Sequence, residues 1–81
     1  MKYPIYSYRD AKASFGMPFV DQNDNSAIRG FRFALNNKDG IMGFSPADFF
    51  LFKIGEFDTE SGSLTPHLPE MICAGNSISV D

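Results

Sequence analysis

The sequence contains one cysteine, one histidine and no tryptophan, and it has no long run of apolar residues. The single Cys73 excludes an intrachain disulfide, and together with the single His67 it leaves zinc without its usual set of ligands. No apolar run approaches the roughly 20 residues of a membrane-spanning helix, and the N-terminus lacks the apolar core of a signal peptide. We therefore expect a soluble intracellular protein with no metal site and no membrane segment.

Motifs that would indicate catalysis are also missing. Residues 21–32 imitate the start of a calcium loop, but Ser26 stands where that loop requires glycine and Arg32 where it requires a bidentate acid. Neither glycine-rich phosphate-binding fingerprint is matched. We expect a non-enzymatic protein without a cofactor.

The charges are unevenly distributed along the chain, which has 81 residues and a net charge of −3. Residues 1–38 hold six bases against three acids, whereas residues 39–81 hold one base against seven acids. Such asymmetry indicates a surface that attracts anions, and chance segregation of charge is the alternative. The length is that of one domain, which we place at 1–81 with residues 75–81 frayed.

The stretch 48–59 combines more large apolar residues than any other segment and predicts the central strand. Alternation places Phe50, Phe52 and Ile54 on one face of this strand. The opposite face then carries Phe49, Leu51, Lys53 and Phe57. Since one helix covers only one face of a sheet, we expect Phe49, Leu51 and Phe57 at the interface of a homodimer or another partner, or beneath the 9–22 loop.

The remaining elements predict an α+β fold in the order strand, helix, strand, strand. Residues 3–8 are typical of a first strand, 24–37 of a helix, and 58–62 of a hairpin loop. A third strand at 63–74 contains two prolines, which indicate an edge position or a strand broken in two. We expect one helix packed on a roughly three-stranded sheet, crossing over in the right-handed sense.

The predicted helix has two distinct faces. Its inner stripe, at helical spacing, consists of Ala27, Ile28, Phe31, Ala34 and Leu35. Its outer arc consists of Arg29, Arg32, Phe33 and Asn36. Gly30, inside the helix, costs about 1 kcal/mol relative to alanine, and we expect it to let the helix lie close to the sheet.

The outer arc places an aromatic ring between two cations, which is the arrangement that single-stranded DNA needs for base stacking and phosphate contacts. Arg9 and Lys12 would extend this track at the end of the first strand. The alternative is a solvated helix face on which Phe33 packs against a neighbouring subunit.

Three separated segments resemble a known phage family in order and spacing. They are YSYRDAKASFG, SAIRGFRFALNNKDGIM and FSPADFFLFKIGEFDTESG. From about Tyr6 to Glu70 the chain resembles the small nonstructural protein of gokushovirus-like microviruses, which are phages with single-stranded DNA genomes.

The resemblance implies a counterpart of microvirus protein C, located in the host cytoplasm, that binds DNA during viral single-stranded DNA synthesis or packaging. The residues themselves leave two functions open. One is a binding module for single-stranded DNA. The other is a protein-interaction factor that docks on the replication initiator or the procapsid without contacting DNA.

Overall fold

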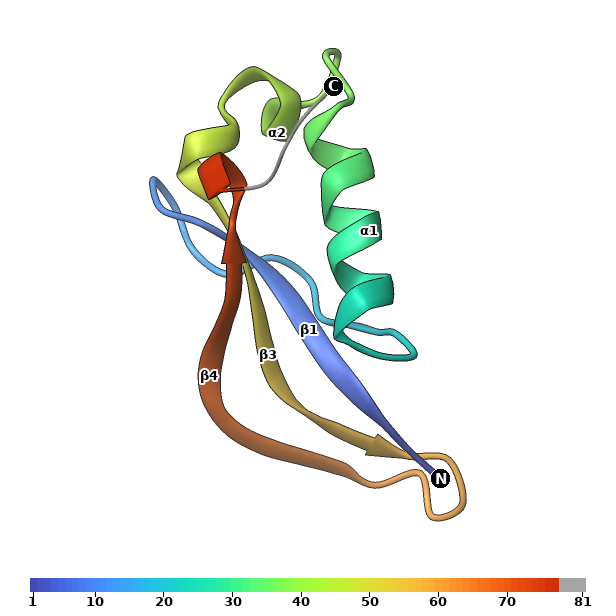
Figure 1. The fold of residues 1–81 in the computed structure, drawn as a ribbon. Helices are drawn as coiled ribbons and strands as arrows, with labels where there is room; N and C mark the ends of the chain where they lie inside the picture. Colours follow the sequence, from blue (N-terminus) through green and yellow to red (C-terminus); the bar gives the residue numbers. More distant parts are fainter. Residues whose placement is uncertain (78–81) are drawn as a thin grey trace.

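The chain forms a four-stranded antiparallel sheet with one main helix on one of its faces, as a computed structural model shows for residues 1–77 (Figure 1). The elements are β1 (Lys2–Asp10), β2 (Phe19–Val20), α1 (Asp24–Leu35), α2 (Ile41–Phe44), a 3-10 turn (Pro46–Asp48), β3 (Phe49–Asp58), β4 (Leu64–Ala74) and a second 3-10 turn (Gly75–Ser77). The predicted α+β class is confirmed. The sequence predicts fraying over residues 75–81. Gly75–Ser77 instead forms the second 3-10 turn, and residues 78–81 lie outside the described residues.

The sheet has four strands in the order β2-β1-β3-β4, one more than the sequence predicts. The additional strand, β2, pairs with β1 through Ile5 and Val20 and through Tyr6 and Phe19. Because β1 and β3 are antiparallel neighbours, α1 does not connect them as a parallel crossover. It joins β2 to β3, which run in the same direction with β1 between them.

Helix α1 begins at an asparagine cap and packs an apolar stripe against the sheet. The Asn23 side chain accepts a hydrogen bond from the Ser26 backbone N–H at 2.8 Å, which satisfies one of the free donors at the helix start. The core consists of Tyr6, Ala27, Phe31, Leu35, Phe49 and Leu51. The predicted inner stripe is therefore correct, with Ile28 and Ala34 only partly buried.

A polar network anchors the first turn of α1 to the two central strands. The Tyr6 hydroxyl of β1 donates to Asp24 Oδ1 at 2.5 Å, and Lys53 Nζ of β3 lies 3.1 Å from the same oxygen. The hydrogen bond from Tyr6, together with the nearby Lys53, holds the pKa of the Asp24 carboxyl below its ordinary value, although partial burial acts to raise it. Burial and the bond to Asp24 raise the pKa of Tyr6.

This anchoring decides which face of β3 the helix covers, and it corrects the sequence prediction. Lys53 alternates with Leu51 and Phe49 on one face of β3, so α1 buries those two side chains, which are 0% and 6% exposed. The expectation that Phe49 and Leu51 face a partner is wrong, because their own helix covers them.

The hairpin of β3 and β4 extends well past the start of α1, so this part of the sheet has no helix on either face (Figure 1). Residues 61–70 are all exposed. β4 lies at the edge of the sheet, as its prolines Pro66 and Pro69 predict. β1 pairs with β3 along its full length, with one extra β3 residue, Ile54, that interrupts the register.

Candidate nucleic-acid interface

The outer face of α1 presents an exposed aromatic ring beside exposed arginines. Phe33 is 79% exposed, and both Arg29 and Arg32 are exposed. Arg29 and Phe33 are four residues apart, so their side chains are neighbours on the helix surface. A phenylalanine this exposed contributes little to the core, which makes it the least explained apolar residue of the helix.

Within the described part of the chain, neither arginine of this face forms an ion pair, so both are available to an external anion. The ion pairs found among residues 1–77 join the N-terminal amine to Asp58 and Lys53 to Asp24, and they involve neither Arg29 nor Arg32. Burial raises the pKa of the Cys73 thiol on β4, and the nearby Arg32 guanidinium partly opposes that rise. Its positive charge is therefore on the β4 side of the helix.

Gly30, on the turn before Phe33, does not serve the close packing that the sequence suggests. A Cβ atom at Gly30 would meet only the Tyr8 hydroxyl oxygen, at 3.9 Å, which is an ordinary contact distance. Gly30 is exposed. Its effect is instead to leave the helix surface next to Phe33 without a side chain.

Asn36 differs from the other residues of the predicted outer arc. It is the C-cap of α1, where its backbone N–H donates to the carbonyl oxygens of Arg32 and Phe33 at 3.1 and 3.2 Å. Its Oδ1 atom is buried and has no hydrogen-bond partner among the described residues. Asn36 therefore ends the helix rather than presenting its carbonyl oxygen to a ligand.

Arg9 and Lys12 do not extend the track of α1. On β1, Tyr8 points towards α1, since its hydroxyl lies near Gly30, and Arg9 alternates to the opposite face. There the Arg9 guanidinium carbon lies 5.1 Å from the centroid of the Phe15 ring. Lys12 is exposed in the turn that follows β1. The six predicted residues therefore do not form one track. Arg29, Arg32 and Phe33 share the outer face of α1, whereas Arg9 lies on the opposite side of the sheet.

We call the side of the sheet away from α1 the open face. By alternation and pairing it carries Tyr3, Ile5, Ser7 and Arg9 of β1, Phe50, Phe52, Gly55 and Phe57 of β3, and Met71 and Ala74 of β4. Phe57, predicted at a partner interface, lies on this face. The sequence reasoning did not select Phe50 or Phe52, which take the positions it gave to Phe49 and Leu51.

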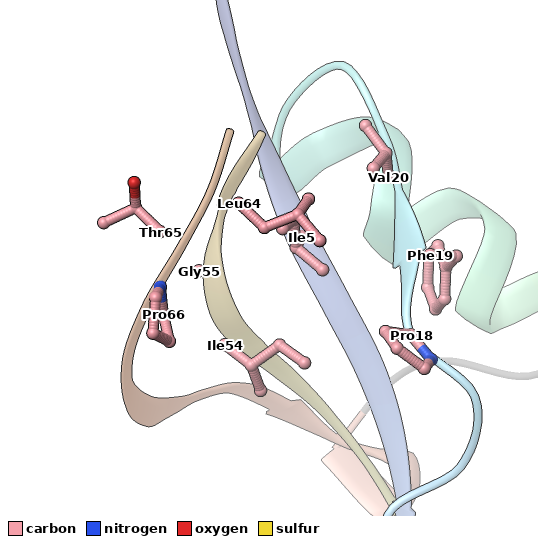
Figure 2. A pocket seen from close by; sticks show the side chains of 9 residues that line it. All are labelled: Ile5, Pro18, Phe19, Val20, Ile54, Gly55, Leu64, Thr65 and Pro66. Atoms are coloured by element: carbon pink, nitrogen blue, oxygen red, sulfur yellow. The ribbon is translucent and has the colours of Figure 1, made fainter. Parts of the chain in front are cut away.

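An apolar groove of about 470 Å³ lies at the lower part of the open face. Figure 2 shows side chains from β1, β3 and β4 converging on it, with the β2 edge opposite. Its lining residues are Ile5, Pro18, Phe19, Val20, Ile54, Gly55, Leu64, Thr65 and Pro66. Higher on the same face, the rings of Phe15 and Phe52 meet edge to face at 5.2 Å between centroids.

Residues 1–77 contain neither a cluster of metal ligands nor a helix suited to crossing a membrane. No group of three or more His, Cys, Asp or Glu side chains in this range could hold a metal ion. Within the same residues, no helix is both long enough and apolar enough to cross a membrane.

Comparison with known proteins gives one match. A family model described as "Phage ORF5 protein" matches residues 3–78, which is nearly the whole chain. No curated protein and no solved structure matches. The family match agrees with a phage origin.

Proposed function

The chain belongs to the Phage ORF5 protein family, and from this premise we propose that it is a non-enzymatic, nonstructural protein that binds single-stranded DNA through the outer face of α1. In this proposal it is a counterpart of microvirus protein C and acts in the host cytoplasm during viral DNA synthesis or packaging. The observation that carries the proposal is Phe33, which is 79% exposed on the same helix surface as the exposed Arg29 and Arg32.

Physical reasons support a single strand as the ligand. Unpaired bases offer ring faces that stack on an aromatic side chain, with a contribution of about 1–3 kcal/mol per base. In duplex DNA the ring faces are already stacked on one another, so Phe33 would find no partner there. Arg29 lies beside the ring and Arg32 lies beyond Arg29 on the β4 side of the helix, so both can contact phosphates next to a stacked base.

A titration of fluorescently labelled single-stranded DNA at several salt concentrations tests the proposal. Phe33→Ala should weaken binding by roughly 5- to 150-fold, the range that corresponds to 1–3 kcal/mol, with the salt dependence unchanged. Arg29→Ala combined with Arg32→Ala should weaken binding and flatten the slope of log K against log salt by about 1.4, or about 0.7 for each lost phosphate contact.

Phe44→Ala is the matched control, because Phe44 is 80% exposed on α2 and adjoins neither arginine in the sequence. It should leave DNA affinity unchanged. If the Phe33 variant and the double arginine variant both bind DNA as the parent does, with circular dichroism spectra unchanged, this helix face is not the DNA site. No DNA binding even at low salt would reject the proposed function itself.

A protein-interaction factor is the second candidate, favoured by the acidic net charge of −3 and by apolar side chains exposed on the helices. Besides Phe33, Ile41 and Phe44 of α2 are 66% and 80% exposed. In this case the chain would dock on the replication initiator or the procapsid. Phe44→Ala would then weaken binding to the purified viral protein while DNA binding would be absent.

A further inference from the structure

The face of the sheet away from α1 departs from the usual polarity. An antiparallel sheet normally packs one apolar face against its helix and leaves a polar face to water. Here most charged side chains of the paired strands lie on the helix side, where they can reach solvent beyond the ends of α1. They are Lys2, Asp10, Lys53, Glu56, Asp58 and Glu70.

The open face carries one charged side chain, Arg9, whose guanidinium already lies over the ring of Phe15. Its other large side chains are aromatic or aliphatic, and several exposed apolar residues border it. Met71 is 55% exposed, Leu64 is 68% exposed and Val20 is 47% exposed. The 11–18 loop covers part of this face, since Ser7 donates to the Gly16 carbonyl oxygen and Phe15 contacts Phe52. Phe50, Phe52 and Phe57 remain half-buried. Leaving the rest of the face in water forfeits roughly 25 cal/mol for each Å² of apolar surface, so a covering partner is expected.

The composition of the open face argues against DNA as this partner. Single-stranded DNA requires a positively charged groove along its backbone, and one arginine supplies one phosphate contact. An apolar face with almost no charge is instead self-complementary, because two identical copies need no matched pattern of opposite charges.

The dimensions also fit a second copy. The Cα atoms span 39 × 23 × 20 Å, so a broad face offers roughly 800 Å², which is the area that each partner buries in an interface of standard size. A domain of this length buries only somewhat over about 60% of the surface of its unfolded chain, less than larger domains do, so association can add stability.

We propose that two copies of this chain pack their open faces together in a two-fold symmetric dimer, a sandwich of two sheets with an α1 helix on each outer side. The dimer goes beyond the DNA-binding function and does not rest on it. Phe52 and Met71, which pair across β3 and β4, lie near the centre of the interface.

The position of Arg9 sets the direction of the pairing. Arg9 lies near the end of β1, beside the start of β3, whereas the turn with Glu60 follows the other end of β3. If the strands of the two copies ran in the same direction, the two Arg9 side chains would approach each other. A two-fold axis across the strands avoids this repulsion. It brings each Arg9 to the end of the other copy's sheet that holds the turn with Glu60 and the N-terminal amine, whose charge is paired with Asp58.

Sedimentation equilibrium of the full chain without DNA tests the dimer. At roughly 100 µM, where a dimer with micromolar Kd is almost fully formed, the mass should be twice the 9.0 kDa of one chain. Met71→Lys should raise the dimer Kd at least about tenfold, because it buries an unpaired ammonium in each copy. Phe44→Lys, at an exposed site on α2, should leave the Kd unchanged.

A charge exchange tests the direction. Arg9→Glu should weaken the dimer, and adding Glu60→Arg should restore it. A mass of 9.0 kDa at that concentration overturns the dimer. If the protein is then a monomer and Met71→Lys abolishes its DNA binding, DNA is the occupant of the open face. A dimer unaffected by Met71→Lys overturns the interface, and one unaffected by Arg9→Glu overturns the antiparallel arrangement.

Discussion

At the scale of single residues, Gly30 combines a cost to the helix with no packing benefit. Glycine in the middle of a helix destabilises it by about 1 kcal/mol relative to alanine. The space around Gly30 would accept a methyl group, since its nearest atom is 3.9 Å away. The position therefore keeps a destabilising residue next to Phe33, as expected where a ligand approaches the helix backbone.

We predict that Gly30→Ala raises the free energy of unfolding by about 0.5–1 kcal/mol in urea titrations. Gly43→Ala is the matched control within α2, because a Cβ atom there would clash with the Asn37 carbonyl oxygen. That variant should be destabilised. A loss of stability in the Gly30 variant would restore the packing explanation for this glycine.

The sequence predicted single residues well wherever the helical period alone decides. Phe31 inside and Phe33 outside follow from their angular positions on α1, and the structure has them 0% and 79% exposed. Asn36 was misplaced because its role as a helix cap depends on where the helix ends, two residues earlier than expected.

At the scale of elements, the network of Tyr6, Asp24 and Lys53 attaches α1 to the sheet and should make stability depend on pH at both extremes. The pKa of Asp24 is lower in the folded state, so its contribution is present above the ordinary aspartate pKa near 4 and is lost as pH falls through the folded value. The pKa of Tyr6 is raised, so its contribution is lost as pH rises above about 10.

Urea unfolding at a series of pH values checks this prediction. Asp24→Asn should reduce the loss of stability at both ends of the series. Lys53→Met should reduce only the acid part, because it removes one group that lowers the pKa of Asp24 while the bond between Tyr6 and Asp24 remains. Identical pH profiles for the parent and both variants would contradict the assigned network.

The same network explains the main error of the sequence prediction. Alternation along β3 separates two apolar faces correctly but gives no indication of which one meets the helix. The presence of Lys53 on the Phe49 face suggests that this face is exposed to solvent. In the structure, Lys53 is instead paired with Asp24 at the start of α1. An acid in the first helical turn matched to a lone base in the central strand was the available signal.

At the scale of the whole molecule, stability should vary along the long axis. The upper half of the sheet packs against α1, while the β3–β4 hairpin beyond it has no helix on either side (Figure 1). Regions with fewer buried contacts open more easily than the core. The second strand, β2, was missed because two paired residues leave no periodic pattern in the sequence.

Native-state hydrogen exchange should show this gradient. Amides of Tyr6 and Leu51, in the core, should exchange at least about tenfold more slowly than those of residues 64–70. Dimerisation through the open face would cover side chains there and should leave this difference between backbone amides in place. Uniform protection along β4 and β1 would contradict a hairpin without helical support.

The prolines at the sheet margins have a consequence for the kinds of assembly open to this protein. Pro66 and Pro69 remove two backbone donors from β4, and Pro18 precedes the two-residue β2 at the other margin. An added strand would find an incomplete row of hydrogen-bonding groups on either side. The sheet therefore resists sideways polymerisation into filaments, so the chain can carry this much apolar surface without seeding fibrous aggregates.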